Sequence, residues 1–133
     1  MMDNVELIEF AKKARAFSFA AISNFKVGAA LLTKSGKVFL GCNIEDPSGI
    51  GVTNICAERC AMVKALSEGY KDFEKIAVVG GIDSLIFCTP CGVCRQYLNS
   101  YCPEVIIVCM DENNNVKELP LRELLPYSFS EKF

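Results

Sequence analysis

The chain has 133 residues, of which 51% are hydrophobic and 23% are charged, and its formal net charge is −2. This composition predicts a single folded domain over residues 1–133 rather than a disordered chain, and the slight acidic excess argues against a nucleic acid partner. No apolar run reaches the roughly 18 residues of a membrane span, and the amphipathic N-terminus lacks the pattern of a signal peptide, so we expect a cytoplasmic protein without a membrane partner.

The first predicted elements are a helix and a hairpin. Residues 5–17 place small and aliphatic side chains on one helical face, and Asp3 or Asn4 can cap the start of this helix. Residues 25–32 and 38–43 are apolar runs separated by a stretch with Lys-Ser-Gly, which is a turn signal between two strands. These two runs predict a β-hairpin.

A loop and a second helix follow the hairpin. Residues 45–54 contain Pro, Ser, Asn and two Gly, a composition typical of a loop, and a loop of this length in a compact domain often carries function. Residues 56–68 lack Gly and Pro and precede Gly69, which predicts a helix with Thr53 or Asn54 as its cap. This helix is apolar on nearly all sides, so we expect it to be buried.

The second half of the sequence alternates strands and helices. Strand-like runs at 76–81, 105–110 and 116–119 flank a predicted helix at 91–101, and a short helical turn follows at 121–125. Alternation of this kind predicts an α/β fold, in which helices cover the faces of a sheet.

Cysteine is abundant and histidine is absent. In a reducing cytosol, clustered cysteines predict metal ligands or redox groups rather than a disulfide framework. Without histidine, a proton shuttle near neutral pH has to be a carboxylate, Lys, Tyr or Cys whose pKa is shifted. The eight cysteines are Cys42, Cys56, Cys60, Cys88, Cys91, Cys94, Cys102 and Cys109.

Two other kinds of site, an iron–sulfur cluster and a redox pair, fit part of the cysteine spacing. An iron–sulfur run of the ferredoxin type needs a further cysteine where Leu98 stands, and Cys102 comes too late in the chain. A redox pair fits Cys91 and Cys94 at a helix start, where the pKa of a thiol falls, but it leaves the sequence CAER at 56–59 without a role.

A zinc ion fits these residues better. Cys91 and Cys94 lie in the first turn of one predicted helix and Cys56 lies at the start of another, so two helix dipoles can direct their positive ends at one cluster of thiolates. A structural zinc takes a fourth ligand, for which Cys60 and Cys88 are the candidates, whereas a catalytic zinc keeps one position for water. We favour three ligands and an open fourth position.

A glutamate stands beside one of the proposed ligands. Glu58 follows Cys56 by two residues in the same helix start. A carboxylate next to a zinc-bound water can take up its proton and pass it on, and the chain offers no histidine for this role. The ordinary alternative is a glutamate that only stabilises the positive end of the helix. Arg59 and Arg95 also lie close to proposed ligands in the sequence, so either can donate hydrogen bonds to the sulfur atoms.

Longer motifs extend the pattern beyond the cysteines. They are FKVGAALLTKSGKVFLGCNIE, CAERCAMVKALSEG, PCGVCRQ and ELLPYSFS. As a set, these motifs resemble the small homotetrameric cytidine deaminases, which belong to the zinc-dependent deaminases that use a glutamate as acid and base. The resemblance covers roughly residues 5–130 and implies a three-layer α-β-α cytidine deaminase-like fold with a mixed sheet of about five strands.

The resemblance also implies an activity and an assembly. It implies the hydrolysis of cytidine and 2′-deoxycytidine to uridine and 2′-deoxyuridine with release of ammonia, as in pyrimidine salvage, with one Zn²⁺ per chain. It implies a homotetramer whose subunits share active sites, in which Phe129 corresponds to an aromatic residue that reaches into the site of a neighbouring subunit.

Five residues correspond to the catalytic zinc site of this family. By the resemblance, Cys56, Cys91 and Cys94 are the zinc ligands and Glu58 is the catalytic proton shuttle. Arg59 corresponds to the residue that bonds to the zinc-bound sulfurs.

Five more residues correspond to contacts with the nucleoside. Asn43 and Glu45 match the pair that holds the ribose 3′-hydroxyl, and Phe25 matches the aromatic residue that packs on the pyrimidine ring. The backbone N–H of Ala57 and the carbonyl of Thr89 are expected to contact the base and its leaving amine.

Two segments depart from the family pattern. Residues 19–23 read FAAIS where the family has Tyr-x-Pro-Tyr-Ser, and residues 46–55 form a longer segment that lacks an expected tyrosine. Both departures fall at the mouth of the substrate site and leave the metal site unaffected. The alternative prediction is therefore a deaminase of a modified cytosine nucleoside such as blasticidin S. Deaminases of nucleic acids fit less well, because they tend to use a histidine ligand and need a basic groove.

Overall fold

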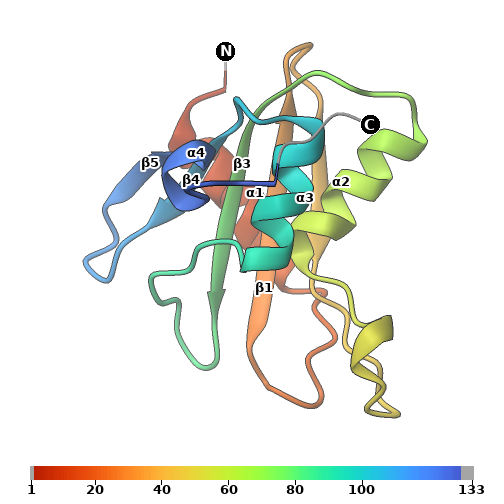
Figure 1. Ribbon diagram of the computed structural model, residues 1–133. Helices are drawn as coiled ribbons and strands as arrows, with labels where there is room; N and C mark the ends of the chain where they lie inside the picture. The colour runs from red at the N-terminus through yellow and green to blue at the C-terminus, as the bar shows by residue number, and fades with distance from the viewer. Residues whose placement is uncertain (1, 130–133) are drawn as a thin grey trace.

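The computed structural model describes residues 2–129, which form a five-stranded mixed sheet between layers of helices (Figure 1). The strands are β1 (Lys26–Thr33), β2 (Val38–Cys42), β3 (Phe73–Gly81), β4 (Ile106–Met110) and β5 (Val116–Pro120). The helices are α1 (Asn4–Arg15), α2 (Ala57–Ser67), α3 (Gly92–Tyr101) and α4 (Leu121–Leu124), with a 3₁₀ turn, η1, at Gly51–Thr53. Between residues 2 and 129, no helix has the length and apolar character that crossing a bilayer requires.

The strands lie in the order β2-β1-β3-β4-β5. β1 pairs antiparallel with β2 and with β3, and β4 pairs antiparallel with β5. β3 and β4 are parallel, which requires the long crossover connection that α3 provides. The predicted α/β fold with a mixed sheet of about five strands is thus confirmed, including the hairpin of β1 and β2.

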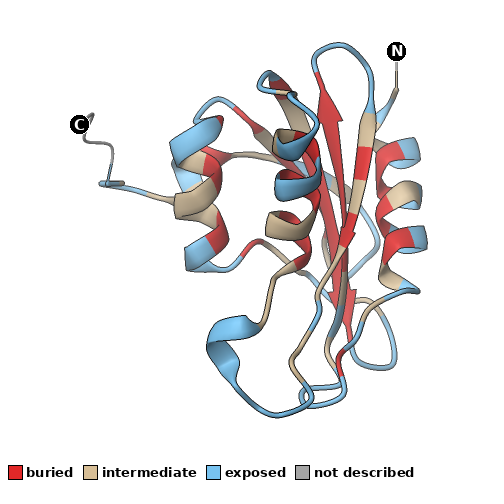
Figure 2. Cartoon of the chain, turned by 90° about the vertical axis from the view of Figure 1, so that its right-hand side faces the viewer, coloured by how far each residue is buried: buried red, intermediate tan, exposed pale blue. Residues whose placement is uncertain are grey.

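The helices cover both faces of the sheet (Figure 2). Because successive side chains of a strand point to opposite faces, β1 contributes to two separate cores. Ala29 and Leu31 pack in the core under α2 and α3, and Ala30 and Leu32 pack in the core under α1. The sheet is therefore the middle layer of three.

The start of α1 follows the sequence prediction, and its end is earlier than predicted. The side chain of Asp3 caps the helix by accepting a hydrogen bond from the N–H of Glu6 at 2.8 Å. The helix ends at Arg15, and the Phe17 side chain is exposed.

Two predictions about α2 were wrong. The N-cap is Cys56 rather than Thr53 or Asn54, because the preceding loop takes its own 3₁₀ turn and the chain enters the helix only at Ala57. The helix is also not buried on all sides: it packs one face on the sheet, and the side chain of Val63 on the outer face is 41% exposed.

The first turn of α2 lies directly on strand β2. A Cβ atom at Gly41 would stand 2.3 Å from the carbonyl oxygen of Ala57 and 2.5 Å from the backbone nitrogen of Ala61. Only glycine permits such an approach of the two backbones. This contact fixes the helix start, and with it Cys56 and Glu58, against the sheet.

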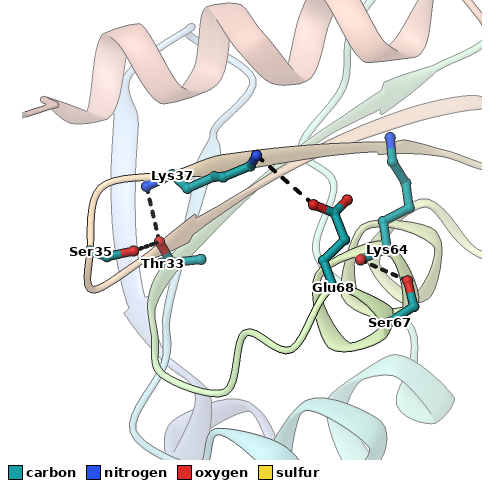
Figure 3. A network of polar contacts seen from close by, with 6 residues as sticks. All are labelled: Thr33, Ser35, Lys37, Lys64, Ser67 and Glu68. Carbon is teal, nitrogen blue, oxygen red and sulfur yellow. Dashed lines mark hydrogen bonds and ion pairs between the residues drawn. The ribbon is translucent and has the colours of Figure 1, made fainter.

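The C-terminal end of α2 contacts the β1–β2 turn through an ion pair (Figure 3). The hydroxyl of Thr33 accepts a hydrogen bond from the N–H of Lys37 at 2.9 Å, and the Lys37 ammonium lies 3.9 Å from a carboxylate oxygen of Glu68. Both side chains of this ion pair are about half exposed, so it contributes little to stability. The turn lies at the end of α2 that is remote from the cysteines.

Candidate active site

Two helices begin with a cysteine at the N-cap position. Cys56 precedes α2 and Cys91 precedes α3, both with extended backbone angles, and neither thiol makes a capping hydrogen bond to its own helix. Cys94 lies in the first turn of α3 and is fully buried. The thiols at both helix starts therefore remain available for another partner.

The structure brings these three thiols together. The sulfur atoms of Cys56, Cys91 and Cys94 all lie within 4.8 Å of one another, and those of Cys56 and Cys91 are 3.7 Å apart. A tetrahedral zinc ion with Zn–S bonds of about 2.3 Å requires sulfur atoms about 3.8 Å apart, so this donor set fits zinc. Neither Cys60 nor Cys88 belongs to this group, which is the one group of at least three metal-ligating side chains within residues 2–129.

The electrostatics of the trio also favour a bound cation. The neighbouring Cys94 thiol lowers the pKa of Cys56 to about 5, with further help from Cys91 and Arg59. The same contact raises the pKa of Cys94, because its thiol keeps the proton that it donates to the Cys56 sulfur, and burial adds to this rise. A positive ion next to these sulfurs would favour their charged forms, because opposite charges stabilise each other.

Arg59 supplies positive charge next to the sulfurs. Its interaction with Cys56 and Cys94 favours the charged guanidinium. Its Nη2 donates a hydrogen bond to the carbonyl of Asn54 at 3.3 Å, and its buried Nε has no hydrogen-bond partner among the described residues. This side chain therefore links the thiols to the loop that precedes α2.

Arg95, the other arginine considered from sequence, has a different place. It donates three hydrogen bonds, from Nε to the carbonyl of Pro90 at 2.7 Å, from Nη1 to the carbonyl of Leu124 at 2.8 Å and from Nη2 to the hydroxyl of Thr89 at 2.9 Å. Arg95 therefore fixes the turn that presents Cys91. Sequence reasoning missed this role, for which the only signal was an arginine directly after the second cysteine of the C-x-x-C motif.

Glu58 lies in the first turn of α2 and is 4% exposed. Burial raises the pKa of its carboxyl group to about 7, and the negative charge of Cys56 adds to this rise. Two residues of a regular helix spaced as Cys56 and Glu58 would face apart. They flank one centre here because Cys56 is the extended N-cap and only Glu58 is inside the helix.

A cavity of about 290 Å³ opens in front of Glu58 and the thiols. This is close to the lower end of the range for sites that take small molecules. Five of the six residues predicted to contact a nucleoside line it, together with residues that sequence reasoning missed. The lining residues are Phe25, Val27, Asn43, Glu45, Asn54, Ile55, Cys56, Ala57, Glu58, Cys88, Thr89 and Cys91.

Asn43 ties the cavity wall to the approach of β1. Its Nδ2 donates to the carbonyl of Phe25 at 2.8 Å, and its Oδ1 accepts from the N–H of Val27 at 2.9 Å and from the hydroxyl of Ser18. These bonds fix the backbone on both sides of Lys26 and thereby the place of the Phe25 ring.

Glu45 holds the divergent segment 19–23 in the same way. One carboxylate oxygen accepts from the N–H groups of Ile22 and Ser23, at 3.0 and 3.1 Å, and the other accepts from the hydroxyl of Ser23 at 2.6 Å. These hydrogen bonds, the Ser23 hydroxyl first, lower the pKa of Glu45. A carboxylate has about four acceptor positions, so Glu45 can take a further donor from a bound molecule.

The divergent segment 46–55 is organised around Asp46. Its carboxylate accepts hydrogen bonds from the N–H and hydroxyl of Ser48 and from the hydroxyl of Thr53, and its own N–H donates to the Asn54 side chain at 2.6 Å. This network brings Asn54 and Ile55 to the cavity wall.

Phe129 is the one predicted contact that lies elsewhere. Its backbone exchanges two hydrogen bonds with the side chain of Gln96 on α3, at 2.8 and 3.3 Å, and its side chain is 63% exposed. It does not line the cavity of its own chain.

Comparisons with known proteins agree with this site. The family model described as the cytidine and deoxycytidylate deaminase zinc-binding region matches residues 1–110. A cytidine deaminase of Halalkalibacterium halodurans is 44% identical over 130 residues, which are 97% of this chain and 96% of that protein. A blasticidin-S deaminase of Bacillus cereus is 30% identical over 133 residues, with 96% of this chain and 92% of that protein covered.

The fold has a close counterpart among solved structures. A crystal structure of the cytidine deaminase from Burkholderia pseudomallei matches with a TM-score of 0.86 and 43% sequence identity, and covers 96% of this chain and 100% of that chain. The matched family region contains Cys56, Cys91, Cys94 and Glu58. The chain belongs to the cytidine and deoxycytidylate deaminase zinc-binding family.

Proposed function

We propose that the chain is a zinc-dependent enzyme that hydrolyses cytidine and 2′-deoxycytidine to uridine and 2′-deoxyuridine with release of ammonia, a reaction of pyrimidine salvage. The observation that carries this proposal is a buried carboxylate, Glu58, that lines one cavity together with two of the three clustered thiols, those of Cys56 and Cys91. The two cytidine deaminases described above are 44% and 43% identical to this chain, against 30% for the blasticidin-S deaminase. Similarity therefore favours cytidine over blasticidin S.

We assign the metal site to Cys56, Cys91 and Cys94, which would hold one Zn²⁺ per chain. A zinc ion with three protein ligands supplies a water whose pKa is lowered to about 7 and keeps it next to the substrate. Arg59 offsets the negative charge of the thiolates, and Arg95 keeps the turn before Cys91 in place.

Glu58 is assigned the proton transfers. Its raised pKa of about 7 allows it to take up a proton and release it at neutral pH. It accepts a proton from the attacking water and donates it to N3 of cytosine. It then takes the remaining proton of the hydroxyl group added at C4 and delivers it to the amino group, so that the C4–N bond breaks, ammonia leaves and the C4 carbonyl of uridine forms. Its burial keeps bulk water away from these transfers.

The remaining lining residues are assigned to the nucleoside. The Phe25 ring packs on the pyrimidine, and the N–H of Ala57 and the carbonyl of Thr89 contact the base and its leaving amine. Glu45 accepts a hydrogen bond from the ribose 3′-hydroxyl. Asn43 assists it, mainly by holding the cavity wall, because its side-chain oxygen already has two donors.

The runner-up substrate is a modified cytosine nucleoside such as blasticidin S. The observation in its favour is that the two divergent segments, 19–23 and 46–55, both adjoin the cavity mouth through Glu45 and Asn54. The proposed zinc ion and Glu58 would act in the same way on cytidine and on blasticidin S. The preference between these substrates therefore depends on the residues at the sugar end of the cavity.

We also propose a cytoplasmic homotetramer with shared active sites. All eight thiols are free, which suits a reducing compartment. The outer face of α2 carries the exposed Val63, and the exposed Phe129 ring lies outside the cavity of its own chain. A neighbouring subunit that covers α2 and receives Phe129 would account for both.

The first prediction concerns the reaction itself. Cytidine and deoxycytidine are turned over, which is followed by the loss of their ultraviolet absorbance, and blasticidin S and free cytosine are poor substrates. Glu58→Gln keeps the zinc but lowers kcat by about 10³-fold, because the proton shuttle is lost. Preferential turnover of blasticidin S would replace the substrate assignment, and full activity of Glu58→Gln would refute the proton shuttle.

The second prediction concerns the metal ligands. The wild-type protein binds about one zinc per chain, and Cys94→Ser retains less than about one tenth of it after dialysis against a chelator. Cys88→Ala is the control, because it removes a half-buried thiol that lines the cavity but leaves the trio intact. Plasma emission spectrometry measures the metal; equal zinc loss from both variants would contradict the three-ligand assignment.

The third prediction separates substrate binding by Glu45 from its role in the loop. Glu45→Ala lowers kcat/KM for cytidine about tenfold, the size of a lost hydrogen bond to a charged group. With 3′-deoxycytidine, which lacks the hydroxyl, the same substitution costs much less. An equal loss with both substrates would show that Glu45 acts only by holding residues 22 and 23.

The fourth prediction concerns the shared site. Phe129→Ala lowers kcat/KM for cytidine about tenfold through the loss of one aromatic contact. Co-expression with the inactive Glu58→Gln chain restores activity, because a mixed assembly contains sites with the intact Glu58 of one subunit and the intact Phe129 of another. An additive activity without such rescue, or a monomer in light scattering, would refute the proposal.

A further inference from the structure

Three side chains of the cavity wall converge over one glycine. A Cβ atom at Gly80 would stand 2.9 Å from the sulfur of Cys88, 3.0 Å from Cε1 of Phe25 and 3.2 Å from Cγ2 of Val27. All three of these side chains line the cavity in front of Glu58. The space that a side chain at position 80 would take is therefore filled by the cavity wall itself.

This convergence is fixed by the backbone on each side. Val27 of β1 stands opposite Gly80 of β3 in the register of the sheet, and Phe25 precedes Val27 by two residues, at the spacing of side chains on one face. The N–H of Ile86 donates to the carbonyl of Gly80 at 2.9 Å, which holds the segment that leads to Cys88 against β3. We call Phe25, Val27, Gly80 and Cys88 the cavity floor.

Cys88 acts in this floor as a neutral packing group. Burial raises the pKa of its thiol to about 12, and the charge of Glu58 adds to the rise, so the thiol stays protonated at neutral pH. It lies outside the group of three metal-ligating thiols. A neutral sulfur next to an aromatic ring makes a favourable contact, and the Phe25 ring and the Cys88 sulfur both lie within 3.0 Å of one point.

We propose that Gly80 and Cys88 are specificity-determining positions, which together set the width of the slot for the pyrimidine ring. Because Gly80 has no side chain, the Phe25 ring and the Cys88 thiol can lie close to strand β3. The slot that remains for the pyrimidine ring is therefore wider. This proposal rests on the proposed function, because it assigns the slot to the base of cytidine. It adds that Cys88 lies outside the group of metal-ligating thiols and that both positions act on the base through the places of the Phe25 ring and the Cys88 thiol.

The proposal predicts a steric penalty that appears in substrate affinity. A methyl group at position 80 has no free space, so it pushes Cys88 or Phe25 toward the bound base. In a hydrophobic pocket, one methyl group that does not fit changes kcat/KM by about tenfold or more. We therefore expect Gly80→Ala to raise KM for cytidine about tenfold, with the zinc content retained.

The experiment compares four variants with the wild type. They are Gly80→Ala, Cys88→Leu, the double variant Gly80→Ala with Cys88→Ala, and Gly51→Ala as the control for a glycine-to-alanine change, since a Cβ at Gly51 meets no atom within 4 Å. For each protein we measure KM and kcat for cytidine, zinc per chain, and the midpoint of thermal unfolding. The double variant removes the nearest clashing atom and should recover most of the lost affinity.

The results distinguish the outcomes clearly. A KM raised about tenfold in Gly80→Ala and in Cys88→Leu, recovered in the double variant and unchanged in Gly51→Ala, supports the proposal. A KM within about twofold of wild type in Cys88→Leu, or no recovery in the double variant, overturns it. If Gly80→Ala fails to fold, the KM of Cys88→Leu alone tests the proposal. A wild-type protein without cytidine turnover counts against the proposed function, whereas normal wild-type turnover with unaffected variants counts against the cavity floor alone.

Discussion

The proposed active site depends on the meeting of two helix starts, each with a cysteine at its N-cap. Because neither Cys56 nor Cys91 caps its own helix through its side chain, both thiols point off the helix ends, and Cys94 joins them from the first turn of α3. Two contacts place these helix starts. The absence of a side chain at Gly41 lets α2 pack closely on β2, and Arg95 holds the turn that leads into α3 through its hydrogen bond to the carbonyl of Pro90. A shift of either helix by one turn would separate the sulfurs by more than a metal ion can bridge.

The same arrangement adjusts the charges that the proposed chemistry needs. Three thiolates carry more negative charge than a divalent ion, and Arg59 and the positive ends of two helix dipoles compensate for the excess. Glu58 is buried away from solvent, which raises the pKa of its carboxyl group, and the negative charge of Cys56 adds to this rise. The arrangement that brings the three sulfurs together thus also raises the pKa of the proposed proton carrier, so the two proposed roles, metal binding and proton transfer, depend on the same contacts.

Local patterns in the sequence predicted most elements of the fold and the cluster of three thiols. Alternating strands and helices predicted the α/β fold, and the spacing of Cys91 and Cys94 with the upstream Cys56 predicted which thiols meet. What could not be predicted depends on approaches between distant segments. The packing of the helices and loops on the sheet determines four such features, and no short stretch of sequence encodes this packing. They are the cap of α2, the exposure of Val63, the hydrogen bonds of Arg95 and the place of Cys88 in the cavity wall. Likewise, Asn43 and Glu45 look like loop residues in the sequence, but in the structure they hold the two sides of the cavity mouth.

The central claim is that three sulfur ligands leave one coordination position of zinc for water. X-ray absorption at the zinc edge of the purified holoprotein tests this claim most directly, because sulfur and oxygen scatter differently and lie at different distances. The account predicts three sulfur atoms at about 2.3 Å and one oxygen at about 2.0 Å. A shell of four sulfur atoms would show a closed structural site, in which Cys60 or Cys88 completes the coordination, and would contradict the account.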